Sequence, residues 1–114
     1  MRIAFLTLGC KLNYAETSTY ERGFTANGLE VVPWEEQADV YLINTCSVTE
    51  RAEKKCRNVI RKMHRVSPGA RIIVTGCYAE LRRNDLLAID GVSLVFGAKE
   101  KSRVVPDTME LILN

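Results

Sequence analysis

The apolar positions of this chain follow two periods in turn, and each period predicts a different kind of element. Short apolar runs that end at Gly, Pro or Asn are typical of strands buried on both faces of a sheet. Apolar residues repeated every three to four positions predict amphipathic helices between those runs. The predicted strands are residues 2–8, 29–32, 40–44, 71–75 and 93–96. The predicted helices are about residues 13–27, 47–66, 80–89 and 99–113.

Capping signals define where two of these helices begin and end. Asn13 with Glu16, and Ser47 with Glu50, have the spacing of a capping box, in which two side chains satisfy the free N–H groups of the first turn. Gly28 follows the first helix as a stop signal. These signals predict helices that begin at Asn13 and just after Ser47.

Strands that alternate with helices predict a single α/β domain over residues 1–114. Such units form a parallel sheet with right-handed crossovers, so helices cover both of its faces. The common five-stranded order is 2-1-3-4-5, and we expect it here. The predicted fold class is therefore a doubly wound five-stranded parallel sheet.

Composition narrows the class of protein further. The chain is 46% apolar and 26% charged with a net charge of +2, which is typical of a globular domain. It contains no run of about 18 apolar residues, so we expect no membrane span. Four cysteines in 114 residues are too few for a secreted disulfide scaffold. We therefore expect a cytoplasmic protein with reduced thiols.

Three of the four cysteines occupy equivalent positions. Cys10, Cys46 and Cys77 each lie two positions after the last residue of a predicted strand, in Gly9-Cys10, Thr45-Cys46 and Gly76-Cys77. In the 2-1-3-4-5 order those strands are neighbours, and their carboxyl ends form the edge where open α/β sheets bind ligands. Cys56 instead lies in an apolar helical stripe, which predicts a packing role.

The spacing of the three cysteines leaves several chemistries open. The outer two of three adjacent strands lie roughly 10 Å apart, so one disulfide cannot use all three thiols. Thiolates select zinc, copper(I) or iron–sulfur clusters, and the short paired spacings of structural zinc sites are missing. Inert buried thiols, or a redox pair in a thiol-redox protein, explain the same residues.

The second helix is basic. Residues 51–65 hold seven Lys or Arg, and Glu50 and Glu53 are the acids beside them. A basic helix near a chemical site predicts contact with nucleic-acid phosphates, and a solvated helix face explains the same pattern.

Three sequence motifs carry a resemblance to a known family. They are Thr7-Leu-Gly-Cys-Lys-Leu-Asn13, Asn44-Thr-Cys-Ser-Val-Thr49 and Val74-Thr-Gly-Cys-Tyr-Ala79. In this order they resemble the N-terminal domain of radical-SAM methylthiotransferases. Lys-Leu-Asn after the first cysteine most resembles the branch that acts on threonylcarbamoyladenosine in tRNA. Other branches act on isopentenyladenosine in tRNA or on a ribosomal-protein aspartate.

The resemblance implies a flavodoxin-like fold and an auxiliary [4Fe–4S] cluster held by Cys10, Cys46 and Cys77. The open iron of such a cluster is thought to hold the sulfur that becomes the methylthio group. The family's second [4Fe–4S] cluster cleaves S-adenosylmethionine and is bound by a C-x-x-x-C-x-x-C motif. A C-terminal RNA-binding domain usually follows. The resemblance thus implies a transferase active in tRNA modification, with tRNA and its own radical-SAM domain as partners.

The present chain contains no C-x-x-x-C-x-x-C motif. We therefore expect the radical-SAM and RNA-binding domains to be absent from it, and the isolated domain to be inactive in methylthiolation. The alternative function is that of a non-enzymatic α/β binding module with inert buried cysteines.

Overall fold

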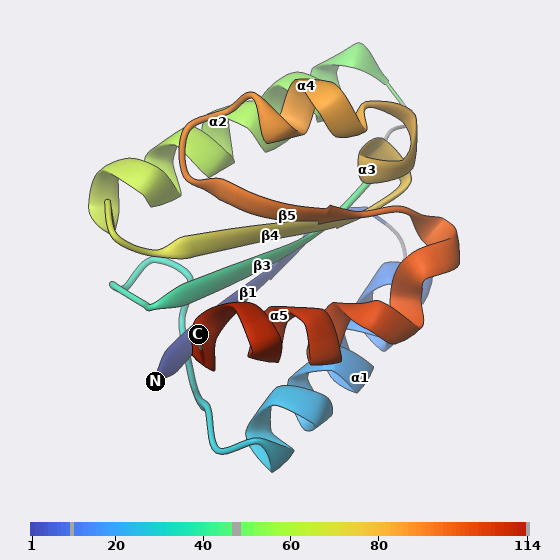
Figure 1. The fold of residues 1–114 in the computed structure, drawn as a ribbon. Coiled ribbons are helices and arrows are strands. Elements are labelled where there is room, and N and C mark those ends of the chain that lie inside the picture. Colours follow the sequence, from blue (N-terminus) through green and yellow to red (C-terminus); the bar gives the residue numbers. More distant parts are fainter. Residues whose placement is uncertain (10, 47–48, 114) are drawn as a thin grey trace.

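The computed structural model describes residues 1–9, 11–46 and 49–113 (Figure 1). The five strands are β1 (Arg2–Thr7), β2 (Glu30–Val32), β3 (Val40–Thr45), β4 (Arg71–Gly76) and β5 (Val92–Phe96). The helices are α1 (Lys11–Ala26), α2 (Glu50–Val66), α3 (Cys77–Leu81), α4 (Arg83–Leu87), the 3-10 helix η1 (Ala98–Arg103) and α5 (Val104–Leu113). As predicted, helices follow β1, β3, β4 and β5, whereas β2 leads to β3 without a helix.

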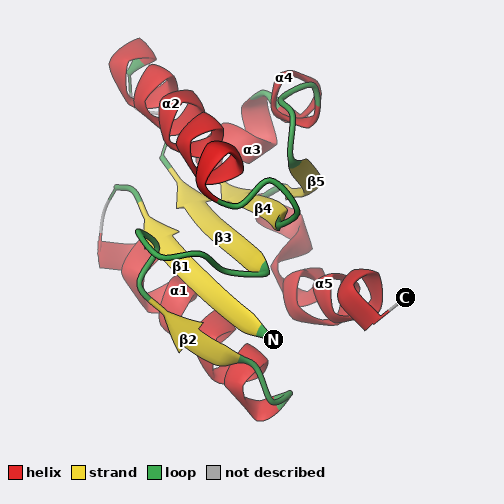
Figure 2. Ribbon diagram, turned by 90° about the vertical axis from the view of Figure 1, so that its left-hand side faces the viewer, coloured by secondary structure: helices red, strands yellow, loops and turns green. Residues whose placement is uncertain are grey.

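The sheet is parallel throughout and has the order β2-β1-β3-β4-β5, which confirms the predicted fold class (Figure 2). Helices α2, α3 and α4 cover one face, and α1 and α5 cover the other (Figure 1). All six residues of β3, in the centre, are buried. This burial on both faces explains why β3 reads as a continuous apolar run in the sequence.

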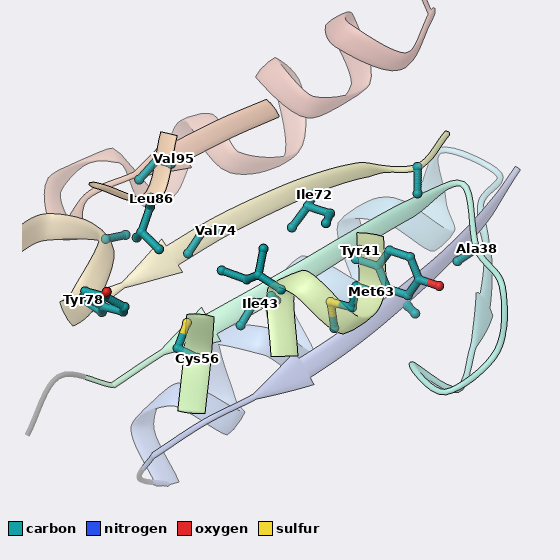
Figure 3. Close-up of a cluster of buried hydrophobic side chains, with 14 of the residues drawn as sticks. Ala38, Tyr41, Ile43, Cys56, Met63, Ile72, Val74, Tyr78, Leu86 and Val95 are labelled. Carbon is teal, nitrogen blue, oxygen red and sulfur yellow. The ribbon is translucent and has the colours of Figure 1, made fainter. Parts of the chain in front are cut away.

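Each face of the sheet has its own hydrophobic core. On the α2 side, Ile43, Ile72 and Val74 pack against Cys56, Ile60 and Met63 of α2 (Figure 3). On the α1 side, Phe24 of α1 and Val104 of α5 pack against strand residues such as Leu42 and Ile73. Because a hydrophobic core packs on each face of the sheet, the ends of its strands are held in a defined register.

Two predicted helix starts differ from the structure. Helix α1 begins at Lys11, so Asn13 is not a cap but lies in the first turn, where its side chain bonds to strand ends. The cap of α2 is Thr49, whose hydroxyl accepts a hydrogen bond from the Ala52 N–H at 3.1 Å. Ser47, the predicted cap, lies outside the described residues.

Two predicted C-terminal helices are each divided. The helix expected at 80–89 begins earlier, at Cys77, and breaks at Arg82, where the backbone (φ −132°, ψ 41°) leaves the helical region. The helix expected at 99–113 is η1 followed by α5. The Glu100 carboxylate accepts a hydrogen bond from the Gly97 N–H at 2.8 Å and pairs with Arg83 and Arg103, which holds the chain in a tight turn before α5.

Candidate metal centre

The carboxyl ends of β1, β3 and β4 meet at one edge of the sheet. Thr7 of β1 is in register with Asn44 of β3, and Asn44 is in register with Thr75 of β4. One residue further on, Thr45 is the register partner of Gly76. Adjacent strands lie about 4.8 Å apart. Cys46 and Cys77, which follow this last pair, therefore leave the sheet side by side.

The third predicted ligand, Cys10, lies outside the described residues. Its sequence neighbour Gly9 is described and lies against Cys46. A Cβ placed on Gly9 would be 2.7 Å from the Cβ of Cys46 and 3.2 Å from its Sγ. Gly9 also has a φ of +111°, which favours glycine. Only a residue without a side chain fits between the end of β1 and Cys46.

Gly76 has the same role at the end of β4. Its φ is +105°, and a Cβ there would overlap the carbonyl oxygen of Thr45 and lie 2.7 Å from the Thr45 nitrogen. The absent side chain lets β4 turn into α3 directly beside β3. Both glycines therefore allow the close backbone approach that brings the cysteine loops together.

Two buried asparagines tie the strand ends to α1. The Asn13 amide donates hydrogen bonds to the carbonyl oxygens of Leu8 at 2.7 Å and Thr45 at 3.1 Å. The Asn44 amide donates to the carbonyl oxygen of Asn13 at 3.0 Å. Asn13 thus joins the segments before Cys10 and Cys46 through one side chain. The sequence interpretation missed this role because Asn13 also fits a helix cap, and its position three residues after a cysteine was the available signal.

A charged pair lies on the same edge. The Lys101 ammonium of η1 forms an ion pair with the Glu16 carboxylate of α1, whose side chain is 15% exposed. The hydrogen bond with Glu16 raises the pKa of Lys101, and the charge of the Cys77 thiolate acts in the same direction. The Glu16–Lys101 pair therefore places a positive charge near Cys77.

The three cysteines that the structure describes fall into two classes. Cys46, Cys56 and Cys77 are free thiols, of which Cys46 is half-buried and Cys77 is exposed. Cys56 is fully buried among the side chains of the α2-side core (Figure 3). Burial raises the pKa of the Cys56 thiol to about 12, so it stays protonated. The packing role predicted for Cys56 is confirmed, and inert burial describes Cys56 but neither Cys46 nor Cys77.

The donor set at this edge fits a thiolate-bound metal group. Cys46 and Cys77 follow adjacent strand ends, and thiolate sulfur is the soft donor that iron–sulfur, zinc and copper(I) sites use. Within residues 1–9, 11–46 and 49–113, no three His, Cys, Asp or Glu side chains are grouped to hold a metal ion. The predicted trio includes Cys10 and so extends beyond those residues.

No helix among the described segments combines the length and the apolar character needed to cross a bilayer. The fold and the positions of Cys46 and Cys77 after adjacent strands define a flavodoxin-like α/β domain with a cysteine site at the carboxyl edge of its sheet. A family model described as uncharacterized protein family UPF0004 matches residues 2–97. The chain belongs to this family.

Curated relatives connect the family to methylthiotransferases. The chain is 44% identical over 103 residues to threonylcarbamoyladenosine tRNA methylthiotransferase MtaB of Bacillus subtilis, covering 90% of this chain and 23% of the relative. It is 31% identical over 109 residues to tRNA-2-methylthio-N(6)-dimethylallyladenosine synthase of Fervidobacterium nodosum, covering 96% and 24%. It is 28% identical over 105 residues to ribosomal protein uS12 methylthiotransferase RimO of Chloroflexus aurantiacus, covering 91% and 23%.

The resemblance to the N-terminal domain of methylthiotransferases, drawn from the three cysteine motifs, is therefore confirmed. The chain spans about a quarter of the length of the curated relatives it matches.

Proposed function

We propose that this chain binds a [4Fe–4S] cluster through Cys10, Cys46 and Cys77, and that the cluster takes part in methylthiolation of tRNA. The main support is the register pair Thr45 and Gly76, which brings the Cys46 and Cys77 loops side by side at the ligand-binding edge of the sheet. The close approach of Gly9 to Cys46 supports Cys10 as the third ligand. When bound, such a cluster would supply or hold the sulfur that is transferred.

The residues around the thiols have separate roles in this proposal. Gly9 and Gly76 let the ends of β1 and β4 pack closely against Cys46 and Thr45, so the loops that carry the ligands begin close together. Asn13 holds the Leu8 and Thr45 carbonyls at a constant separation, so the loops that follow start from a rigid base. Lys101, paired with Glu16, offsets part of the negative charge that several thiolates would gather.

The proposed substrate is threonylcarbamoyladenosine in tRNA. The support is the higher identity to the MtaB relative, 44%, than to relatives of the two other branches, 31% and 28%. Because the chain spans about a quarter of these proteins, transfer itself belongs to a whole enzyme. We propose that its other parts include a radical-SAM domain that binds a second cluster and S-adenosylmethionine.

Anaerobic reconstitution with iron and sulfide tests cluster binding by this chain. We expect about four irons per chain, the content of one [4Fe–4S] cluster. Cys10→Ala, Cys46→Ala and Cys77→Ala should each lower the bound iron strongly. Cys56→Ala is the matched control and should keep the full content, because its thiol is buried in the core. A folded chain that takes up no iron, or equal iron in all four variants, would contradict the proposal.

A further inference from the structure

Helix α2 concentrates positive charge on one side of the molecule. It carries seven Lys or Arg and two Glu, a net charge of +5, in a chain whose total is +2. Six of the seven basic side chains are exposed, and Arg57 is half-buried, donating a hydrogen bond to the Tyr78 hydroxyl at 2.8 Å. This surface is therefore available to an anionic partner.

A groove of about 500 Å³ runs along this basic helix. Its walls consist of one face of α2 and the Trp34 side chain, which follows β2. The lining residues are Trp34, Arg51, Lys54, Lys55, Asn58, Val59, Lys62 and Arg65. Trp34 and Val59 pack against the α2-side core, so the floor of the groove is apolar and rigid. The groove thus combines an apolar floor with a row of cations.

Trp34 is half-buried and is the single tryptophan of the chain. The Lys62 ammonium lies over its ring, 5.4 Å from the ring centroid. An aromatic ring beside several cations is the combination that binds single-stranded nucleic acid, because bases stack on the ring while phosphates meet the charges. An acidic peptide would use the cations but would gain no stacking on Trp34.

From this arrangement we infer that the groove between α2 and Trp34 binds an unpaired segment of RNA. Lys54 and Lys55 contact phosphates, and a base stacks on Trp34 by displacing the Lys62 ammonium from the ring, which then pairs with a phosphate. The groove is separate from the candidate metal centre. Its assignment to RNA rests in part on the proposed role in tRNA modification. The N-terminus of α2 follows the Cys46 loop, so an RNA bound along α2 extends toward the candidate metal centre.

Titration of a hairpin RNA into the metal-free 114-residue chain tests the inference, because Trp34 fluorescence reports directly on the groove. We expect saturable quenching whose affinity falls steeply with salt. Lys54→Gln/Lys55→Gln should weaken binding about tenfold and reduce the slope of log affinity against log salt by roughly 1.4, near 0.7 per lost phosphate contact on a single strand. Arg22→Gln/Lys99→Gln removes the same charge from exposed positions outside the groove and should change both quantities much less.

Variants of Trp34 separate stacking from charge. With a labelled hairpin followed by anisotropy, Trp34→Phe should retain most of the affinity, and Trp34→Leu should lose about five- to tenfold, near the lower range for one stacked base. Circular dichroism and thermal unfolding establish that both variants remain folded.

Three results would overturn the inference. These are no quenching by RNA, equal losses in the two charge variants, or quenching by polyglutamate as strong as by RNA, which would assign the groove to an acidic protein. Because the protein is metal-free, the outcome is independent of whether the chain binds iron. Failure here and failure of the cluster proposal are thus distinguishable.

Discussion

Thr45 and Gly76 are register partners on adjacent parallel strands, and a side chain on Gly76 would overlap the Thr45 carbonyl oxygen. Each is followed directly by a cysteine. The contact between these two residues therefore sets the distance between the starts of the Cys46 and Cys77 loops. It also makes Gly76 the most constrained glycine at the candidate site.

Gly76→Ala should destabilise the domain strongly. The positive φ alone costs about 1–3 kcal/mol for a residue with a side chain, and the overlap with Thr45 adds about 1 kcal/mol or more. Gly28→Ala is the matched control, because its φ is +88° and nothing lies within 4 Å of the added Cβ. Urea unfolding should show a larger loss for Gly76→Ala than for Gly28→Ala. Equal losses would mean that the close approach to β3 is unimportant.

Asn13→Ala should lower the free energy of unfolding by about 1–3 kcal/mol, since it removes the donor for two part-buried or buried carbonyls. Asn13→Asp should cost more, because a carboxylate would face the Leu8 and Thr45 oxygens without a proton to donate. Asn58→Ala, at an exposed position on α2, should change stability by less than about 0.5 kcal/mol. Denaturant unfolding of the three variants provides the comparison. An Asn13→Ala variant with an unchanged free energy of unfolding would contradict the role assigned to this residue.

Much of the fold could be predicted from the sequence because β3 and β4 contain continuous apolar runs, residues 40–43 and 72–74, that end in polar residues or Gly. These patterns locate the strands, and the common order of such sheets then places Cys46 and Cys77 at one edge. The role of Asn13 could not be predicted, since its two acceptors come from β1 and β3, which are distant in sequence. The local sequence pattern favoured a helix cap, but the Asn13 side chain instead forms tertiary hydrogen bonds to the strand ends.

The divided helices were missed for a similar reason. The break at Arg82 has no Gly or Pro to mark it. The turn before α5 depends on Glu100 reaching Gly97 and Arg83, and Arg83 lies 17 positions earlier in the chain. Periodicity within one segment carries no information on such partners.

Protonation of Glu100 should weaken this turn at acid pH. The hydrogen bond from the Gly97 N–H, followed by Arg83, lowers the pKa of the Glu100 carboxyl. A lowered folded-state pKa stabilises the fold above the unfolded pKa, and this contribution disappears as the pH falls through the folded value. Glu100→Gln should therefore lower the melting temperature by a few degrees at neutral pH and by much less in acid. Glu110→Gln, at an exposed position, should show no such difference.

The raised pKa of Cys56 should make the free energy of unfolding decrease at alkaline pH. Its pKa is raised to about 12 by burial, from 9.0 in the unfolded chain, so only the unfolded state loses the proton between these values. Stability from the protonated thiol is therefore complete below pH 9 and decreases above it, by about 1.4 kcal/mol near pH 10. Cys56→Ala should lack this part of the decrease when unfolding is measured near pH 8 and near pH 10. An identical decrease in the variant would contradict the account of this thiol.

Differential alkylation before and after reconstitution tests the central claim, a metal group held by three of the four thiols, most directly. Mass spectrometry of the metal-free chain should find Cys10, Cys46 and Cys77 modified and Cys56 protected by burial. After anaerobic loading with iron and sulfide, the first three should become protected together, in proportion to bound iron, while Cys56 stays unmodified. Iron-loaded protein in which Cys46 or Cys77 remains as reactive as before would contradict the claim.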